Sequence, residues 1–478
     1  MAARNIRQMP PRSDAPGPSI LDGASSTEVE QAQRYRPLPT GTHGLDPELV
    51  KRDQRERLQK AMIELIAAKG YPAVRIVDLA KLAHVSQPTF YSLYADKEDL
   101  FLSAYQEVAR RSARTVMDAY DADGPRAQRV VVAMRAWAEL AAAEPESTSL
   151  LVLGAFGAGA KALERRTRIL EELERAIHVS RDGAPAADPS DLTVKAIIGG
   201  IREVTAARLR EGRASELPAL ADELTAWAAC YPRRLPAGLE APPVERRSSG
   251  EVVTATPSER ARRAEGRLPS GRSDLPRQFI VKNQRERIVD ATAAIVAEKG
   301  LAALTIPEIA RRANVSNQTF YDIYASKHDA FLGAQKVGMH KALVVSVEAY
   351  QAQADWPCAA RAGLRALLEF LASEPAHAHL SLVDTFAACP EAIEIRSATL
   401  KAFAEYFGPA YELAGDRVEV PAIAGEAIAG GIWQIMHHYI ENDCIAELCG
   451  AAPQLTHFAL TPFLGSERAA SYALSDGA

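Results

Sequence analysis

Residues 54–101 read QRERLQKAMIELIAAKGYPAVRIVDLAKLAHVSQPTFYSLYADKEDLF, and residues 284–331 read QRERIVDATAAIVAEKGLAALTIPEIARRANVSNQTFYDIYASKHDAF. The second stretch follows the first by 230 positions without a gap, and 22 of the 48 aligned residues are identical. The identities gather in the run V-S-x-x-T-F-Y-x-x-Y-A-x-K-x-D-x-F. A repeated stretch of this kind is one structural unit used twice. The chain is therefore expected to contain two copies of one domain.

The second copy has the pattern of a helix-turn-helix. Thr305 precedes Ile306-Pro307-Glu308, which is a helix N-cap followed by residues that a first helical turn prefers. Asn314-Val315 predicts a tight turn, and Ser316 caps the next helix, whose Phe320 points inward. The major groove of DNA admits one such helix, with its N-terminal residues facing base edges. The first copy repeats the pattern with Ile76, Leu79, Ala80, Val85, Ser86, Phe90 and Leu93.

The repeated run resembles the N-terminal DNA-binding domain of the TetR/AcrR family of bacterial repressors. The resemblance covers about 50 residues in each half and extends more weakly over the ~130 helical residues after each, where that family keeps its ligand and dimer domain. The closing segment, residues 430–465, resembles the C-terminal helix pair of that family. The resemblance implies an all-α fold of two tandem TetR-like units, each a three-helix helix-turn-helix domain followed by a helical bundle. It also implies a sequence-specific DNA-binding transcriptional regulator.

Two groups of residues are expected to face DNA, one in each copy. Amides and hydroxyls on the second helix of the motif can pair with base edges, and the capped N-terminus of that helix favours phosphate. The copies differ: Arg75 stands where a capping Thr or Ser is expected, and Pro88 removes one N–H from the first turn. The two copies are therefore expected to read different bases. The candidate DNA-binding residues are Arg75, Ser86, Gln87, Pro88, Thr89, Tyr91, Tyr94 and Lys97 in the first copy, and Thr305, Ser316, Asn317, Gln318, Thr319, Tyr321, Tyr324 and Lys327 in the second.

Composition divides the chain into seven segments. Residues 1–46 are rich in Pro, Gly, Ser and charge without an apolar period, which predicts a disordered N-terminal arm. Residues 232–276 have a similar composition and are expected to form a flexible linker. Repetition extends past the motif, because IIGGI at 197–201 recurs as IAGGI at 428–432. The remaining segments are helix-turn-helix domains at 47–100 and 277–330, helical ligand and dimerisation domains at 101–231 and 331–468, and a C-terminal tail at 469–478.

The helical segments are candidates for a ligand cavity. Pockets between bundled helices are mostly apolar with a few polar anchors, so a small apolar or amphipathic effector is expected. Aromatic residues at helical spacing are also typical of a plain core. The histidine and cysteine intervals match no compact ligand set, which predicts no metal and no cofactor. The candidate ligand-binding residues are Phe156, Phe370, His377, Phe386, Trp433 and His437.

Other classes of protein fit the sequence less well. An apolar fraction of 47% and a charged fraction of 24% are those of an ordinary globular protein. The sequence contains no run of eighteen apolar residues, so no membrane span is expected. A cytoplasmic location is expected. The chain has no GxSxG, P-loop or HExxH motif, so an enzyme is not expected. The alternative is a helical interaction or scaffold protein in which one or both copies do not bind DNA.

Two units on one chain predict a single-chain pseudo-dimer. The family resemblance implies paired domains in successive major grooves, about 34–36 Å apart. A flexible linker of residues 232–276 would span ~35–40 Å, which is long enough for that spacing. The expected function is a repressor that a ligand releases from an imperfect palindromic operator. A homodimer of fused chains stays open, as do the effector, the operator and the sign of regulation.

Overall fold

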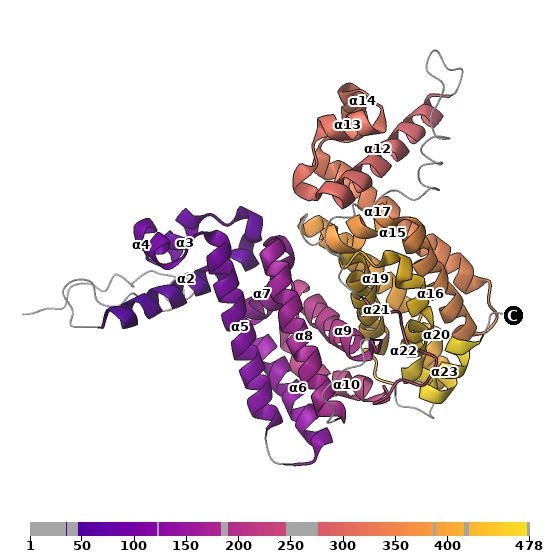
Figure 1. Cartoon of the computed structure of the whole chain (residues 1–478), viewed down its shortest axis with the longest axis horizontal. Helices are drawn as coiled ribbons and strands as arrows, with labels where there is room; N and C mark the ends of the chain where they lie inside the picture. Colours follow the sequence, from indigo (N-terminus) through magenta and orange to yellow (C-terminus); the bar gives the residue numbers. More distant parts are fainter. Residues whose placement is uncertain are drawn as a thin grey trace, which may run out of the picture.

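The computed structural model describes Tyr35 and residues 46–121, 124–182, 190–244, 276–385, 389–414 and 420–475. Every regular element within these residues is a helix, so the predicted all-α fold is confirmed (Figure 1). None of the described helices combines the length and the apolar character that crossing a membrane requires.

The helices follow the same order in both units. In the first unit they are α2 (Pro47–Lys69), α3 (Ile76–Leu82), α4 (Gln87–Leu93), α5 (Lys97–Tyr120), α6 (Arg126–Ala143), α7 (Pro145–Val152), α8 (Ala160–Asp182), α9 (Thr193–Arg210) and α10 (Leu217–Ala229). In the second unit they are α12 (Arg277–Lys299), α13 (Ile306–Ala313), α14 (Asn317–Ile323), α15 (Lys327–Gln351), α16 (Trp356–Ser373), α17 (Pro375–His379), α19 (Pro390–Glu405), α20 (Gly408–Ala414), α21 (Ala424–Glu441), α22 (Ala452–Leu464) and α23 (Ser466–Leu474). The repeat therefore extends over whole units.

Each unit begins with a helix-turn-helix domain that has its own apolar core. In the first domain, α2–α4 and the start of α5 bury Phe90 and Phe101 completely. In the second domain, α12–α14 and the start of α15 bury Phe320 and Phe331 in the same way. In Figure 1 the first domain lies at the left and the second at the top right, each at the upper end of the bundle helices of its own unit. The helices α5 and α15 run from these domains into the bundle.

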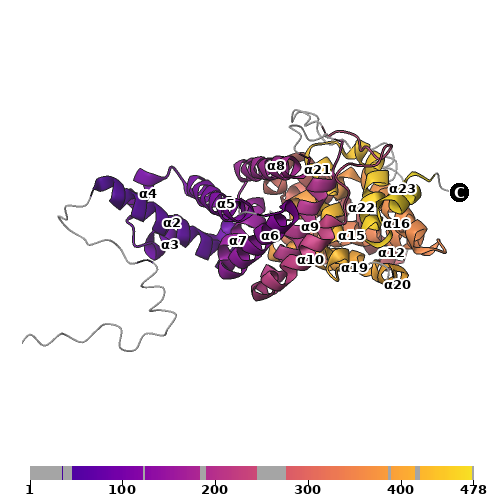
Figure 2. The same cartoon turned by 90° about the horizontal axis from the view of Figure 1, so that it is seen from below.

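The two units meet where α9 packs against α21, and these helices lie side by side in both views (Figures 1 and 2). A Cβ atom on Gly200 of α9 would clash with the carbonyl oxygen of Ala427, and one on Gly431 of α21 would lie 2.7 Å from that of Ala196. Both glycines are needed because only a hydrogen fits between the two backbones. Gly200 and Gly431 are 231 positions apart, as are Ala196 and Ala427, so the contact is reciprocal. Such reciprocity is the mark of an isologous dimer interface, here within one chain.

Aromatic side chains extend this contact. Trp227 of α10 lies edge-on to Phe458 of α22, with ring centroids 6.0 Å apart, and Tyr231 stacks on Phe458 at 4.5 Å. Trp227 and Phe458 are again 231 positions apart and both are buried. Residues of α9 and α10 thus belong to the largest apolar cluster, most of which comes from the second unit. The first unit depends on the second for much of its burial.

Two segments that composition assigns to the arm and the linker pack against the helices. Tyr35 is buried against the first helix-turn-helix domain, and its hydroxyl donates to Glu64 at 2.9 Å. Residues 232–244 bury Leu239, and the Tyr439 hydroxyl donates to the Pro242 carbonyl at 2.5 Å. The sequence predicts a flexible linker over 232–276, but the structure packs residues 232–244 against the helices. The reason is that apolar side chains among the prolines, such as Leu239, pack against the second unit. The rest of the predicted arm and linker, apart from the helix N-cap residues Asp46 and Pro276, lies outside the described residues.

The predicted C-terminal tail is also part of the fold. The helix α23 covers most of it and buries Ala470 and Ala473 against Leu239. The arginine Arg361 of α16 donates to the carbonyl oxygen of Tyr472 at 3.3 Å. The second unit is therefore longer at its C-terminal end than the composition indicates, because small alanines at helical spacing are enough to bury one face.

Candidate functional site

The second helix of each helix-turn-helix domain, α4 or α14, begins with the same cap. The Ser86 hydroxyl accepts a hydrogen bond from the Thr89 N–H at 3.1 Å, and Ser316 accepts one from Thr319 at 3.0 Å. The two hydroxyls of each pair also contact one another, at 2.8 and 2.9 Å. The capping role expected for both serines is confirmed. The threonines are half-buried because their hydroxyls turn back to the cap.

The first turn of each of these helices presents different side chains at the same positions. Gln87 and Pro88 are exposed on α4, as are Asn317 and Gln318 on α14. On α14 the Gln318 amide donates to Asp322 at 3.1 Å, and this carboxylate adds a negative charge to the exposed face. Amides pair well with adenine, and a carboxylate accepts from cytosine. The two surfaces therefore offer different hydrogen-bonding patterns to a groove.

The four tyrosines expected to face DNA fall into two classes. Tyr91 and Tyr321 are 56% and 54% exposed. Tyr94 and Tyr324 are only 5% and 8% exposed, and their rings belong to the domain cores. Burial raises the pKa of both buried hydroxyls, and the Tyr94 hydroxyl lies 3.4 Å from that of Ser103. The rings of Tyr94 and Tyr324 pack in the domain cores. Only their hydroxyl groups could therefore contact DNA.

The two lysines of the repeated run bind their own domains. The Lys97 ammonium donates to the carbonyls of Tyr71 and Val74 at 3.1 and 3.0 Å and lies 4.2 Å from the centre of the Tyr71 ring. The Lys327 ammonium donates to the Leu304 carbonyl at 2.9 Å. Both therefore close the turn that follows the first helix of their domain. Their predicted contact with a phosphate stays a prediction.

The helix before α4 or α14 is capped differently in the two domains. In the second domain Thr305 accepts from the Glu308 N–H at 3.4 Å. In the first domain Arg75 makes no side-chain cap and instead donates to the Asp78 carboxylate at 2.8 and 3.1 Å. The Arg75 side chain is 76% exposed and keeps its charge at the surface. The sequence expectation of an uncapped helix at Arg75 is confirmed.

The repeated QRER run contains two arginines with separate roles. The second arginine holds the turn: Arg57 donates to the His84 carbonyl at 3.2 Å and Arg287 to that of Asn314 at 3.3 Å. His84 and Asn314 both have φ of 51°, a left-handed conformation that ends α3 and α13. The turn of each helix-turn-helix is thus fixed by an arginine that lies 27 residues earlier in the chain.

The first arginine of the run is exposed and was not singled out from the sequence. Arg55 and Arg285 occupy equivalent positions on α2 and α12 and form no ion pair with a described residue. Burial raises the pKa of the tyrosine that follows α4 or α14, and the charge of the arginine partly offsets this rise, which places the arginine beside that end of the helix. An exposed arginine there suits a phosphate contact. The identical QRER in both copies was the signal for these residues.

A buried polar network joins the two units beside the glycines. Arg396 of α19 pairs with Glu203 of α9 at 2.7 Å, and Arg210 pairs with the same carboxylate at 2.9 Å. At the equivalent place Arg166 of α8 donates to the neutral Gln434 of α21 at 3.4 Å. Burial alone would raise the pKa of Glu203, but the two guanidinium groups lower it to about 2. The network therefore has two unlike halves. We call the ion pair of Arg396 with Glu203 the charged arm, and the contact of Arg166 with the uncharged Gln434 the neutral arm.

The side chain beside each arm differs as well. The Arg396 guanidinium stacks over the Trp433 ring at 4.5 Å. Arg202 stands 231 positions before Trp433 and donates to the Val152 carbonyl at 2.8 Å. Burial and the neighbouring positive charge of Arg166 lower the pKa of Arg202 to about 9. The first unit thus has a second, half-buried arginine where the second unit has an aromatic ring.

The second unit contains a cavity of about 80 Å³ between α15, α16, α19, α21 and α22. Its polar wall groups are largely satisfied: Ser346 donates to the Gly363 carbonyl at 2.9 Å and Tyr350 to that of Tyr406 at 3.3 Å. The exception is the indole N–H of Trp433, which is buried and has no hydrogen-bond partner among the described residues. The apolar part of the wall includes Leu367, Phe403, Phe407, Trp433 and Met436.

Of the four expected ligand-binding residues whose side chains the structure describes, only Trp433 lines this cavity. His377 is buried elsewhere and pairs with Asp290 of α12 at 3.1 Å. His437 lies 3.4 Å from Glu441, and burial and nearby arginines lower the pKa of this histidine. Phe370 packs on the outside of the large apolar cluster. Phe386 and the side chain of Phe156 lie outside the described residues.

Known proteins were found to resemble the chain in sequence and in structure. The family described as bacterial regulatory proteins, tetR family, matches it twice, at residues 59–104 and 288–333. No curated protein matches. Similar solved structures include the fatty acid degradation regulator FadR from Bacillus halodurans and FadR from Bacillus subtilis in complex with stearoyl-CoA, each with 17% identity, a TM-score of 0.33, and 36% of this chain and 96% of the other covered. A TetR-like transcriptional regulator from Rhodococcus sp. RHA1 has 18% identity and a TM-score of 0.31, with 38% and 96% covered.

Both family matches fall on the helix-turn-helix domains, from α2 into α5 and from α12 into α15. Each domain has the capped second helix and the exposed polar first turn described above. Each half of the chain therefore contains a DNA-binding domain of the tetR family of bacterial regulatory proteins, and the chain is a DNA-binding transcriptional regulator with two TetR-like units in tandem.

Proposed function

We propose that this regulator is a single-chain pseudo-dimer, which represses transcription from an imperfect palindromic operator until a small apolar or amphipathic effector releases it. The reciprocal packing of α9 on α21 carries the proposal. An isologous interface relates two domains by a two-fold axis, and a two-fold axis matches the symmetry of a palindromic site. Here both domains come from one chain, so one molecule occupies both half-sites.

The two half-sites differ in sequence. Gln87 of α4 reads one and Asn317 of α14 reads the other, and Asp322 adds an acceptor only in the second. Arg55 and Arg285 contact phosphates beside the helices and position each domain without reading sequence. The operator is therefore a palindrome in its spacing but not in every base.

The cavity of the second unit binds the effector. By comparison, a dry apolar cavity of about 150 Å³ holds benzene, so the present cavity accepts only a small group before its walls must separate. The Trp433 indole N–H offers one hydrogen bond, which favours an effector with an acceptor next to its apolar part. Ser346 and Tyr350 of α15 belong to the wall, and the same helix begins in the second helix-turn-helix domain. Separation of the walls moves α15 and shifts the population away from the operator spacing.

Selection of bound duplexes from a random DNA pool tests the operator. Light scattering on the selected complex gives the number of chains. One chain on an asymmetric two-part site is the expected result. A symmetric site that binds two chains would contradict the pseudo-dimer and would leave one helix-turn-helix domain per chain without a sequence-reading role.

A second experiment tests the effector cavity. Small apolar alcohols, ketones and fatty acids are screened for release of the labelled operator by fluorescence anisotropy. Trp433→Phe removes the N–H and replaces the indole with a smaller aromatic ring, so an active compound should release the operator at a roughly 2- to 13-fold higher concentration. Trp137→Phe, a half-buried change in the first unit, is the matched control and should have no effect. Equal responses of the two variants would remove Trp433 from the effector site.

A further inference from the structure

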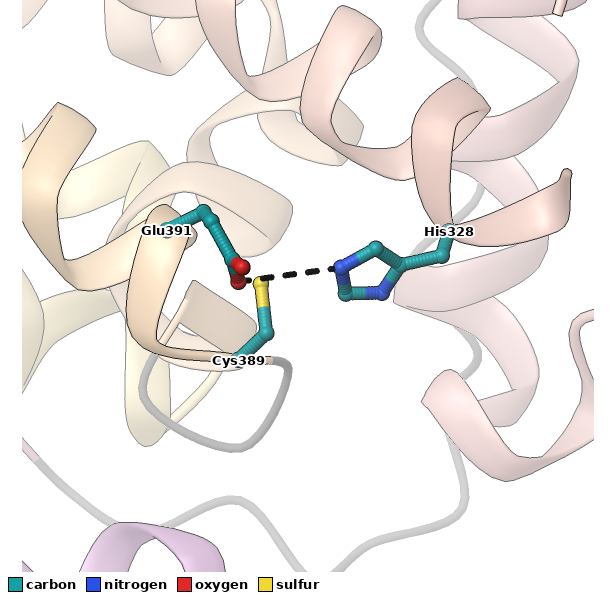
Figure 3. A group of neighbouring side chains, drawn as sticks. All are labelled: His328, Cys389 and Glu391. Atoms are coloured by element: carbon teal, nitrogen blue, oxygen red, sulfur yellow. Dashed lines mark ion pairs between the residues drawn. The ribbon is translucent and has the colours of Figure 1, made fainter. Parts of the chain in front are cut away.

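Three side chains that are far apart in the sequence meet where α15 and α19 begin (Figure 3). His328 lies in the first turn of α15, next to the second helix-turn-helix domain, while Cys389 and Glu391 lie at the start of α19. One potential ligand atom from each lies within 4.8 Å of the other two, and the His328 Nε2 and Glu391 Oε2 atoms are 3.9 Å apart. We propose that His328, Cys389 and Glu391 bind a divalent transition metal of the zinc type.

The donor set selects the class of metal. An imidazole nitrogen, a thiolate sulfur and a carboxylate oxygen are the three ligand types of zinc sites, whereas magnesium and calcium take oxygen ligands. Three protein ligands leave the fourth tetrahedral position for water. The Cys389 sulfur also accepts the Ala392 N–H at 3.4 Å, which orients it toward the other two groups. On binding, the thiol proton leaves to solvent.

Only a small movement is needed to close the site. Bonds of about 2.0–2.3 Å in a tetrahedral site put its ligand atoms about 3.3–3.8 Å apart. The 3.9 Å between His328 and Glu391 is already close to that range, and no separation exceeds 4.8 Å, so the closing movement is at most about 1.5 Å. His328 and Glu391 are 48% and 60% exposed, so their side chains can make this adjustment without repacking the core.

The first unit shows what this position does when its chemistry is different. Glu98, Gly159 and Lys161 stand 230 positions before His328, Cys389 and Glu391. Lys161 pairs with Glu98 at 3.1 Å and so joins α8 to the start of α5. The same two helices are therefore tied by a permanent ion pair in the first unit. In the second unit His328 and Glu391 form an ion pair only when the histidine is protonated, so a metal would be needed to tie the helices when it is neutral.

Occupation of this site would fix the second helix-turn-helix domain on its bundle. His328 follows Lys327, which closes the turn of that domain, and Glu391 belongs to α19, whose later residues line the effector cavity. The metal would thus hold the domain in one orientation, as the Lys161–Glu98 pair holds the first. The effect on DNA rests on the function proposed above, whereas metal binding itself does not.

Cobalt tests the binding step on the full chain. After treatment with a chelator, the protein is titrated with Co²⁺, and the thiolate-to-cobalt charge-transfer band is followed by absorption. One equivalent with this band is expected, and zinc should abolish it. His328→Ala, Cys389→Ser and Glu391→Gln should each weaken cobalt binding at least about 100-fold. His340→Ala, an exposed change on the same helix, and Cys358→Ser should bind as the wild type does. Absence of the band in wild type, or its survival in Cys389→Ser, would overturn the site.

A double substitution tests the tie between the helices. His328→Glu with Glu391→Lys gives the second unit the residue types of Glu98 and Lys161, which form the ion pair of the first unit. This variant should fold without binding cobalt. Zinc should raise the affinity of wild type for the second half-site roughly 5- to 150-fold and leave the double variant unchanged. Cobalt binding without any DNA binding would defeat the proposed function and keep the metal site. Cobalt binding with DNA binding that ignores zinc would keep the site and reject the tie.

Discussion

The two units have the same helices in the same order, yet their polar groups differ in the first turns of α4 and α14 and inside the helical bundle. The second unit has Trp433, a charged Arg396 arm and a cavity, while the first has Arg202 and a neutral arm through Arg166. The glycines and aromatic residues between the units stay matched across the pseudo-axis. The comparison teaches that the scaffold is constrained by the mutual fit of the units, whereas each ligand-facing and DNA-facing surface changes alone.

The largest effect should come from breaking the charged arm. Arg396→Met leaves the buried Glu203 with Arg210 alone, and loss of a buried partner costs about 3–5 kcal/mol. Arg166→Met should cost much less, because Gln434 is neutral and Arg202 is freed from a like charge. Urea unfolding gives both free energies, with Arg365→Met on the exposed face of α16 as the control. Equal losses for Arg396→Met and Arg166→Met would refute the asymmetry.

The same carboxylate predicts how stability depends on pH. The pKa of Glu203 is lowered to about 2 in the folded protein, against an ordinary value of 4.5. Its contribution is therefore complete above pH 4.5 and is lost as the pH falls through 2, up to about 3 kcal/mol in all. In Arg396→Met the folded pKa should rise and the loss should begin at higher pH. Urea midpoints measured at successive pH values check this, and parallel curves for the two proteins would contradict it.

Filling the space between the units should have the next largest effect. Gly200→Ala places a methyl group against the Ala427 carbonyl and should cost about 1–3 kcal/mol. Gly431→Ala should behave alike, because it meets Ala196 in the reciprocal contact. Gly408→Ala, where an added Cβ has nothing within 4 Å, is the matched control. Thermal unfolding of the three variants provides the comparison, and wild-type stability in both interface variants would show that α9 and α21 do not pack closely.

An effect of similar size, confined to single base pairs, separates the two DNA-facing helices. Gln87→Ala should relax base preference in one half-site, and Asn317→Ala in the other, by about 1–3 kcal/mol at the base concerned. Competition binding with operators changed at single bases measures both. If each variant alters the two half-sites equally, then two chains share the operator, and the pseudo-dimer fails.

The smallest effect concerns phosphate contacts. Arg55→Ala and Arg285→Ala should each lower the slope of log affinity against log salt by about 1, with base preference unchanged. Lys327→Ala distinguishes a phosphate contact from a purely structural role of this lysine. A lower salt slope at wild-type stability would assign it to a phosphate, whereas lost stability at an unchanged slope would leave it with the Leu304 carbonyl alone.

Local signals in the sequence were enough for the fold and for part of the site. The repeat, the serine caps and the exposed first turns of α4 and α14 follow from neighbouring residues, whose spacing determines which face they share. The burial of Tyr94 and Tyr324 was not foreseen, because the same pattern suits a core or a surface.

Groups assembled from distant residues could not be read from spacing. Arg396 and Glu203 are separated by most of a unit, and their pairing depends on how α9 meets α21. His328 and Cys389 are 61 positions apart and come together only through the packing of α15 and α19. The sequence predicted no metal because its histidines and cysteines are not closely spaced. That criterion cannot detect ligands that come together only in the folded chain.

The reciprocal contact of Gly200 and Gly431 also bears on how this protein can evolve. In a homodimer every substitution occurs on both sides of the two-fold axis. A change at the interface therefore affects stability twice, and a new base preference must suit both half-sites at once. In this chain each mutation is expressed on one side only. Half the regulator can drift toward a new signal or a new DNA sequence while the other half keeps its old one, and intermediates along that path retain one working side.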